Sequence, residues 1–322
     1  MIKPPFVSVV LPICNGEDFI LDAINSICAQ SFKDFELIVI DNASTDATPS
    51  LIKQAAKKDN RIIILTNKIN IGVVGSLNRG LKEARGIYYA RMDGDDIALQ
   101  TRLAEQVTYM EAHPNLVVLS NWGEKFGDAR GRIITPTSPA GIRATSLFVS
   151  PIVHASCIMR VSILRKYQIT YRPNCPLEDF DLWVRLSKIG DLAALPRVLF
   201  RYRVHGLSMT ARASPYIRGA MRVILRDSLE NYLEPRGLRC VLNNFILELH
   251  SRFSCQEKMN LIEYVILPFW LIFLVVISGS CAYPKVVLRR GISYLKKAVF
   301  GRLLSQPEII YKTHRDIEKL AM

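Results

Sequence analysis

The 322-residue sequence lacks the short motifs that mark several common classes of nucleotide-binding and metal-binding protein. It has no G-x-x-x-x-G-K-[ST] phosphate loop, and no G-x-G-x-x-G follows its first apolar run, which argues against P-loop NTPases and dinucleotide oxidoreductases. Its seven cysteines include no C-x-x-C pair, so neither a disulfide framework nor a zinc site is indicated. The first residues also lack the apolar core and cleavage site of a signal peptide. We therefore expect a reduced, cytoplasmic environment for the folded N-terminal part.

Glycine, proline and acidic residues are all limited in number. With 17 Gly, 16 Pro and 49% apolar residues, the composition is that of a globular protein and not of a disordered one. Only 29 acidic residues stand against 42 Lys and Arg, which gives a formal net charge of +13. Such a surplus suits nucleic acid, an anionic membrane surface or a phosphate-bearing substrate, and charge alone does not choose between them.

Short β-rich runs alternate with amphipathic helical patterns along the first part of the chain. Strands are expected at 6–12, 35–41, 61–66 and 86–93, with helices at 17–30, from about 47 and at 73–84. Ser44 or Thr45 is expected to cap the second helix. The alternation predicts βαβ units and an α/β fold with a mostly parallel sheet. In such sheets ligands bind at the carboxyl ends of the strands.

Acidic residues gather at the expected carboxyl ends of these strands. Asp41 ends the second strand, where it could equally be a simple turn residue, and Asp93, Asp95 and Asp96 follow the fourth. Carboxylates this close raise one another's pKa unless a cation is present, and Mg²⁺ or Mn²⁺ held by one or two carboxylates plus substrate phosphates would provide it. An EF-hand loop is excluded, because counting from Asp93 places alanine at the positions that need glycine and glutamate.

Four segments in this order resemble family 2 glycosyltransferases of the GT-A fold. They are "VSVVLPICNGEDFILDAINSICAQSFKDFELIVIDNASTDAT", "NIGVVGSLNRGLKEARGIYYARMDGDDI", "LEDFDLWVRL" and "LFRYRVHGLSMT". They are similar to that family's opening strand with Pro-x-x-Asn, its strand-end Asp, its Asp-x-Asp metal motif and its Glu-Asp acceptor-side motif. The resemblance covers about residues 6–210 and implies a Rossmann-like catalytic domain that inverts the anomeric centre of a nucleotide-sugar donor.

The resemblance also implies roles for the residues on the donor side. Pro12 and Asn15 belong to the opening segment of the nucleotide site, and Asp41 would hydrogen-bond the base. Asp93 would lie near the ribose, and Asp95 would ligate the Mn²⁺ or Mg²⁺ that bridges the diphosphate. A metal acting as a Lewis acid would stabilise the departing negative charge.

On the acceptor side the resemblance makes Asp179 the general base that deprotonates the acceptor hydroxyl. A single in-line attack needs no covalent nucleophile. Glu178 and Asp181 suit the first turn of a helix, where acidic residues interact favourably with the helix dipole. His205 could contact the diphosphate or the metal, and His154 resembles a position on the acceptor side, although either histidine could instead be structural.

The last third of the chain predicts a different organisation. We expect a catalytic domain at 1–210, a helical extension at 211–260 and a membrane-associated region at 261–322. The 20 residues 264–283 carry no charge and are long enough to span a membrane. A basic tail follows, so a single span would place the catalytic domain outside. A re-entrant or in-plane helix followed by an amphipathic helix on anionic lipid is therefore preferred, with a buried core helix as the alternative.

The expected function is metal-dependent sugar transfer to a glycan or lipid-linked acceptor, in bacterial surface polysaccharide or lipid-linked glycan synthesis at the cytoplasmic face of the membrane. The alternative is a noncatalytic sugar-nucleotide-binding or scaffold subunit of a membrane complex that makes glycans. Nucleic acid is not an expected partner, because the candidate crevice is acidic.

Overall fold

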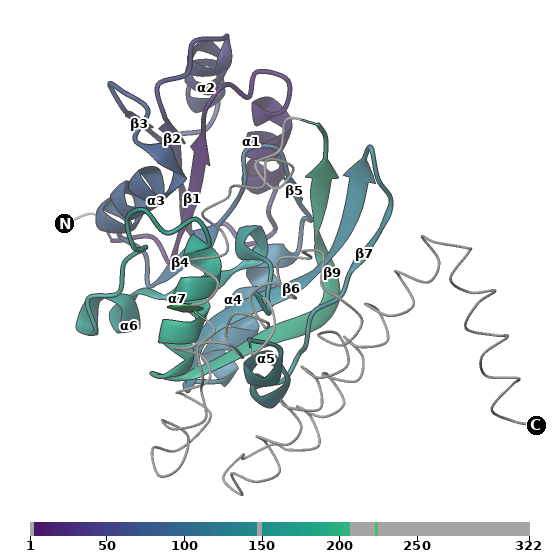
Figure 1. Cartoon of the computed structure of the whole chain (residues 1–322). Helices are drawn as coiled ribbons and strands as arrows, with labels where there is room; N and C mark the ends of the chain where they lie inside the picture. The colour runs from purple at the N-terminus through teal and green to yellow at the C-terminus, as the bar shows by residue number, and fades with distance from the viewer. Residues whose placement is uncertain (1–2, 147–149, 207–222, 225–322) are drawn as a thin grey trace, which may run out of the picture. The chain divides into compact units, whose positions relative to one another are not determined.

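The computed structural model describes residues 3–146, 150–206 and 223–224. The chain divides into two compact units, residues 1–220 and 221–322, and all the elements below belong to the first (Figure 1). None of the helices within the described ranges is long and apolar enough to cross a membrane. The expected apolar helix at 264–283, the basic tail and the domain boundaries at 210 and 260 lie outside the described residues.

Strands and helices alternate through the first half, as the periodicity predicts. The elements are β1 (Val7–Ile13), α1 (Ile20–Cys28), β2 (Phe35–Asp41), α2 (Thr48–Ala56), β3 (Ile62–Thr66), α3 (Gly72–Glu83), β4 (Tyr88–Arg91), β5 (Ile97–Ala98) and α4 (Arg102–Ala112). The second half contains β6 (Leu116–Gly127), β7 (Gly131–Ile133), α5 (Pro139–Ser146), the short 3₁₀ helix η1 (His154–Ser156), β8 (Ile158–Arg160), α6 (Val161–Lys166), α7 (Glu178–Ser187) and β9 (Asp191–Val204).

The nine strands of the described residues form one sheet, in the order β3-β2-β1-β4-β8-β6-β9-β5, with β7 paired to β6. The first four strands are parallel, as predicted. Strand β8 runs antiparallel to both β4 and β6. Strand β5 is antiparallel to β9, and β7 is antiparallel to β6, whereas β6 and β9 pair in parallel. The expectation of a mostly parallel sheet therefore holds for β1 to β4, and the sheet as a whole is mixed.

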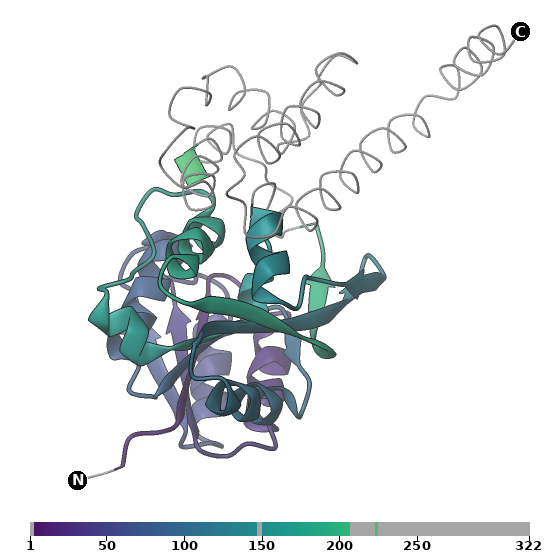
Figure 2. The same ribbon diagram turned by 90° about the horizontal axis from the view of Figure 1, so that it is seen from below.

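Helices cover both faces of the sheet (Figures 1 and 2). Alternation along β1 places Val7, Val9 and Leu11 on one face and Val10 on the other, and all four side chains are fully buried. Helices α1, α2 and α4 pack on the first face. Helices α3, α5, α6 and α7 pack on the second. Burial on both sides explains why β1 and β2 are almost continuously apolar.

The start of α2 differs from the prediction. Its N-cap residue is Ala47, which has no capping side chain, so the expected caps Ser44 and Thr45 are wrong. These two residues instead bind Asn15. The Ser44 hydroxyl accepts a hydrogen bond from the backbone amide of Asn15 (3.0 Å), and the side-chain oxygen Oδ1 of Asn15 accepts one from the backbone amide of Thr45 (2.8 Å). The Ala47 amide donates to the Glu17 carboxylate (2.7 Å). The β2–α2 loop is thus tied to the β1–α1 loop, and a side chain of the β1–α1 loop accepts a hydrogen bond from the backbone amide at the N-cap of α2.

A bend in β9 carries the end of this strand toward the acidic loop. Asn121 of β6 pairs with Leu195, but the next residue, Trp122, pairs with Val198, so β9 carries extra residues at this point. Pro196 lies among them and cannot donate to the ladder, which favours a bulge. Beyond it, β9 pairs with β5, the strand that follows residues 93–96. The bulge therefore allows β9 to deliver its last residues to the candidate site.

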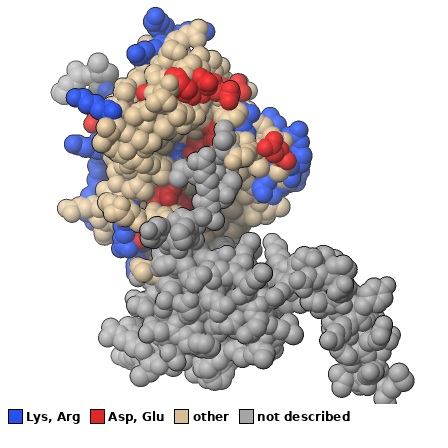
Figure 3. Space-filling view, turned by 45° about the horizontal axis from the view of Figure 1, so that its top comes forward, with Lys and Arg blue, Asp and Glu red and all other residues tan. Residues whose placement is uncertain are grey.

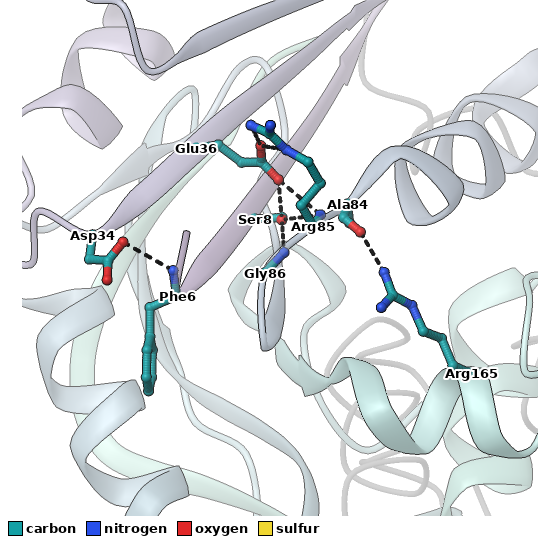
Figure 4. A network of polar contacts seen from close by, with 8 residues as sticks. All are labelled: Phe6, Ser8, Asp34, Glu36, Ala84, Arg85, Gly86 and Arg165. Atoms are coloured by element: carbon teal, nitrogen blue, oxygen red, sulfur yellow. Dashed lines mark hydrogen bonds and ion pairs between the residues drawn. The ribbon is translucent and has the colours of Figure 1, made fainter. Parts of the chain in front are cut away.

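A buried carboxylate joins the amino ends of β1 and β2 to the chain before β4 (Figure 4). Glu36 is 3% exposed and accepts hydrogen bonds from the Ser8 hydroxyl (2.6 Å) and the Arg85 amide (3.0 Å). The Arg85 guanidinium binds its other oxygen. Gly86 donates to the Ser8 oxygen at 2.8 Å, and a Cβ on Gly86 would lie only 2.6 Å from the Ser8 nitrogen. The close approach of these chains explains the glycine.

We expect Glu36→Gln to lower the free energy of unfolding by about 2 kcal/mol, because charge-assisted hydrogen bonds to Arg85 are weakened and an amide NH₂ is placed against donors. Urea unfolding of the full-length protein would measure the change. The matched control is Asp34→Asn, since among the described residues the Asp34 carboxylate accepts only an exposed hydrogen bond from the Phe6 amide and pairs with an 84% exposed Lys3. Its cost should stay below about 0.5 kcal/mol. Equal losses in the two variants would contradict a special role for Glu36.

Candidate active site

The carboxyl ends of β1, β2 and β4 meet at one edge of the sheet, as predicted. Ile13 lies opposite Asp41 in the β1–β2 register, and the Asn42 amide donates to the Ile13 carbonyl (2.8 Å). On the other side of β1, the Met92 amide donates to the Val10 carbonyl (3.1 Å). Acidic side chains are visible around a recess on this side of the molecule (Figure 3). The three strand ends therefore place their polar residues around a common site.

The loop after β1 is fastened to the loop after β2. Asn15 has φ of 53°, a left-handed conformation that asparagine tolerates better than most residues. Asp41 is 3% exposed and its Oδ1 accepts a hydrogen bond from the Ser44 amide (3.0 Å), so it does form the turn contact that its sequence context allows. Pro12 is buried within β1 opposite Ile40, and there it shapes the strand end. Asn15 and Asp41 are thus brought together through Ser44.

Three asparagines that the sequence analysis missed join the ends of β2 and β3. Asn67 Nδ2 donates to Asn42 Oδ1 (2.9 Å), and Asn42 Nδ2 donates to Asn70 Oδ1 (2.8 Å). Asn70 also accepts the Gly72 amide at the start of α3 (2.9 Å). The signal that could have found them is positional, because each asparagine lies within a few residues of a strand's carboxyl end. They fix the two loops that flank Asp41.

Each carboxylate of the acidic loop has a partner within the chain. Asp93 Oδ1 pairs with Arg91 Nη2 (2.5 Å), and Asp95 Oδ2 lies 2.9 Å from His205 Nε2. Asp96 Oδ1 accepts a hydrogen bond from the Arg203 amide (2.8 Å). Sequence reasoning expected a divalent ion to compensate these charges. The fold already supplies protein partners, two of them from the end of β9, more than 100 residues away in the chain.

Burial makes the acidic loop electrostatically costly. Asp96 is fully buried, and burial followed by the charges of Asp93 and Asp95 raises its pKa well above the usual range. Asp96 Oδ2 has no hydrogen-bond partner among the described residues. Burial, and then the charge of Asp93, also raises the pKa of Asp95, while the contact with His205 lowers it. A cation arriving at this loop would therefore be favoured.

His205 and Arg203 are held by aromatic contacts at the end of β9. The His205 ring lies 4.9 Å from the Phe19 ring, and the Arg203 guanidinium lies 4.6 Å from the same ring and 4.4 Å from Phe126. Arg203 Nε also donates to the Asp95 carbonyl (2.7 Å). His205 Nδ1 is buried without a partner among the described residues. The arrangement fixes His205 Nε2 against the Asp95 carboxylate.

Two carboxyls from the first turn of α7 lie within electrostatic reach of the acidic loop. Asp179 Oδ2 accepts a hydrogen bond from the Ser150 hydroxyl (3.0 Å) and its Oδ1 accepts one from the Phe180 amide (2.7 Å). Burial raises the pKa of Asp179, and the charge of Asp93 raises it further, so the two carboxylates lie within electrostatic reach of each other. Burial and then the charge of Asp179 raise the pKa of Glu178 to about 7. Glu178 therefore lies in the first turn of a helix, as expected, but its carboxyl is also part of the group of interacting acids around Asp179.

Asp181 and His154 have structural surroundings. Asp181 is 3% exposed and pairs with Arg172 Nη1 (2.8 Å) and Arg185 Nε (2.8 Å), as expected for a structural acid. His154 Nε2 lies 2.9 Å from the Tyr171 hydroxyl, and its ring packs edge-on against that of Trp183, 5.7 Å away. Burial lowers the pKa of His154 well below its usual value, so it is neutral at pH 7. The His154 ring thus packs against α7 through Trp183.

Comparison with known proteins agrees with this geometry. Residues 8–168 match the family model described as glycosyl transferase family 2. An uncharacterized glycosyltransferase of Haemophilus influenzae is 32% identical over 274 residues, which cover 81% of this chain and 85% of that protein. The chain belongs to glycosyl transferase family 2. It is accordingly a glycosyltransferase.

Two further proteins extend the comparison of this glycosyltransferase. The Escherichia coli protein WfaP, named UDP-Glc:alpha-D-GlcNAc-diphosphoundecaprenol beta-1,3-glucosyltransferase, is 30% identical over 79% of this chain and 98% of its own length. Among solved structures, Staphylococcus aureus TarS 1-349 in complex with UDP-GlcNAc is similar with a TM-score of 0.65 and 19% identity, covering 91% of this chain and 89% of that one. The latter likeness shows the fold, and the expected GT-A architecture is confirmed.

The glycosyltransferase fold brings most of the predicted site residues together. Asp95 and His205 are in contact, Asp93 lies two residues before Asp95, and Asp179 of α7 lies within electrostatic reach of Asp93. Sequence reasoning missed Arg91 and the asparagine cluster. It also missed Ser150, which binds the predicted base. Arg91 carried a signal, because a charged residue inside the apolar strand "GIYYARMD" must be buried on one face or the other.

Proposed function

We propose that this glycosyltransferase moves a sugar from a nucleotide-sugar donor to an acceptor hydroxyl, with a divalent metal and with inversion, in bacterial surface polysaccharide or lipid-linked glycan synthesis. One observation carries the proposal. The half-buried carboxyl of Asp179 lies within electrostatic reach of Asp93 in the acidic loop after β4. The site therefore offers a place for a departing diphosphate and a base for the incoming hydroxyl.

The donor side would be formed by the loops after β1, β2 and β4. Asn15 and Asp41, held together through Ser44, would contact the nucleoside, and Pro12 would set the path of the chain beneath it. Asp93 is 34% exposed and is available to the ribose. These assignments follow the family resemblance, and the geometry supports them because all four positions lie around the same strand ends.

The residues present fit a divalent metal. Asp95 Oδ2 and His205 Nε2 lie 2.9 Å apart, close to the roughly 3 Å that separates adjacent ligands of a small octahedral cation with bonds of about 2.1 Å. No cluster of three or more His, Cys, Asp or Glu side chains that could hold a metal occurs in the described part of the chain. Diphosphate oxygens and water would supply the remaining ligands. When bound, Mn²⁺ or Mg²⁺ would act as a Lewis acid on the departing diphosphate.

The acceptor side would use Asp179 as the general base. Burial raises the pKa of Asp179, which makes it a stronger base than an exposed aspartate, and the hydrogen bonds from Phe180 and Ser150 oppose that rise by stabilising the carboxylate. A single base opposite the leaving group suits direct in-line displacement, and inversion follows from that path.

The acceptor class is inferred from the relatives. The WfaP name specifies a lipid-linked diphosphoundecaprenol acceptor. We extend this class to the present chain, whose net charge of +13 also suits an anionic membrane surface, and propose that it works at the cytoplasmic face of the cell membrane. A noncatalytic sugar-nucleotide-binding subunit is the competing function. The two differ in whether a bound donor is turned over.

A thermal-shift screen of nucleotide sugars, with and without Mn²⁺, tests the proposal. A donor present at about 100 times its Kd should add about 2.7 kcal/mol of stability, or several degrees in Tm, and the shift should need Mn²⁺. The donor identified in this way should then be consumed in the presence of undecaprenyl-linked saccharides. The absence of any nucleotide-dependent shift would contradict the proposed function, and a shift without turnover would favour the noncatalytic alternative.

A further inference from the structure

Arg91 is a buried arginine at the floor of the site, at the last position of β4. Side chains alternate along a strand, so Arg91 shares its face with Tyr89, which packs in the cluster beneath α7. The Arg91 side chain is 3% exposed, and its charge influences the pKa values of Glu178 and His154. Its charge therefore acts on a donor-side carboxyl, Asp93, and on an acceptor-side one, Glu178.

The guanidinium of Arg91 is directed along the strand toward Asp93. Nη2 pairs with Asp93 Oδ1 at 2.5 Å, and Nη1 donates to the Met92 carbonyl. The Arg91 carbonyl in turn accepts a hydrogen bond from the buried Arg102 (2.6 Å), which fixes the backbone below it. Within the described residues Asp93 is the sole ion-pair partner of Arg91. Burying a guanidinium is costly unless it is paired, so this contact holds Arg91 and Asp93 in one arrangement.

Asp93 is held by one oxygen only. Its Oδ1 is bound to Arg91, while its Oδ2 accepts no hydrogen bond from the residues that the structure describes. The Asp93 side chain is 34% exposed, whereas that of Arg91 is almost fully buried. A carboxylate fixed from below in this way presents its second oxygen in a defined direction. Planar guanidinium geometry suits the task, because one fork can serve the Met92 carbonyl and the carboxylate together.

We propose that Arg91 is a positioning residue, which holds Oδ1 of Asp93 so that Oδ2 is presented to the hydroxyl groups of the donor nucleotide. This inference rests on the proposed function, in which Asp93 contacts the nucleotide. Arg91 itself touches no ligand. Its contribution is to remove the freedom of the Asp93 side chain before the donor binds and to offset the charge that Asp93 adds to the acidic loop.

The test is calorimetric titration of the full-length protein with UDP and with GDP, each in Mn²⁺. Arg91→Met should weaken binding of whichever nucleotide the wild type prefers by about 10-fold or more, since a charge-assisted contact is lost. Arg91→Lys keeps the positive charge but not the planar guanidinium, so its nucleotide affinity should lie between those of the wild type and Arg91→Met. Arg160→Met is the matched control: Arg160 lies on neighbouring β8 at the other end of β4, where it binds the Leu116 and Met110 carbonyls. It should bind the nucleotide as the wild type does.

A double-mutant cycle distinguishes positioning from general support of the fold. If Arg91 acts through Asp93, the variant Arg91→Met/Asp93→Asn should bind nucleotide about as weakly as Asp93→Asn alone. Additive losses, or wild-type affinity in Arg91→Met, would overturn the inference. A wild type that binds neither of these nucleotides, nor any nucleotide sugar in the thermal-shift screen, would instead contradict the proposed function. In that case the stabilities of the same four proteins, measured by urea unfolding without ligand, still test the pair. If the losses of stability in the two single variants simply add up in the double variant, the two side chains are not coupled and the positioning role is overturned.

Discussion

Asp179→Asn should lower the rate of sugar transfer by about 10²- to 10⁴-fold, the range that a positioned general base contributes. The substitution keeps the size of the side chain and one acceptor oxygen for the Phe180 amide, and its NH₂ group can donate to the Ser150 hydroxyl in place of the hydrogen bond that Asp179 accepts. It removes the capacity to take the acceptor proton. Donor affinity should change by less than about threefold, because Asp179 lies on the acceptor side. The measurement is initial-rate kinetics with the donor and acceptor found by screening.

The pH dependence of the wild type should report the same group. Burial raises the pKa of Asp179, so the protonated, inactive form appears at a higher pH than for an exposed aspartate. The kcat/KM value should therefore fall as the pH is lowered through this raised pKa, and it should be constant above it until another group titrates. In Asp179→Asn the residual rate should lose this acidic limb.

Glu178→Gln is the control that identifies the base. The pKa of Glu178 is raised to about 7, so this residue also titrates in the working range and is the competing candidate. Its replacement should shift the acidic limb toward lower pH, because the negative charge beside Asp179 is removed, while most of the rate remains. If Glu178→Gln abolished transfer and Asp179→Asn retained it, the two roles would have to be exchanged.

The first half of the fold was predictable because local patterns decide it. The runs that form β1 and β2 are apolar and β-branched, and the helix between them repeats Ile20, Ile24 and Ile27 on one face. Parallel βαβ units then follow from connection length. The same logic placed Asp41 and the acidic loop at neighbouring strand ends. These features depend on residues close together in the sequence.

The rest of the site depends on pairings that no local pattern carries. Strand β9 contains Pro196 and several arginines, a composition that does not indicate a strand crossing the sheet. Its parallel pairing with β6 and the bulge at Pro196 allow His205 to reach Asp95 across 110 positions. The partners that the end of the β9 segment supplies to Asp95 and Asp96 could not be predicted for this reason, and a bound metal was the available explanation. The protein partners from β9 and the expected metal would both offset the negative charge of the acidic loop.

Asp95→Asn should lower sugar transfer by about 10³-fold and abolish the dependence of donor binding on Mn²⁺. An amide is a much poorer ligand than a carboxylate for a hard cation, and the loss of several kcal/mol of charge stabilisation corresponds to this factor. Donor affinity should be measured by calorimetry over a series of Mn²⁺ concentrations and in EDTA. Asp22→Asn is the control, because the Asp22 side chain is 62% exposed and, within the described residues, contacts the site through Arg203 alone, at 3.4 Å.

The stability of Asp95→Asn separates loss of metal from loss of fold. Burial and the charge of Asp93 raise the pKa of Asp95, so its ionised form is less favourable in the folded state than in the unfolded chain. Removing that charge should relieve repulsion, which offsets the lost contact with His205, and Tm should be unchanged or higher. A variant that is inactive, stable and indifferent to Mn²⁺ would fit a metal ligand. If Asp95→Asn bound the donor with the wild-type response to Mn²⁺, the metal assignment would be wrong.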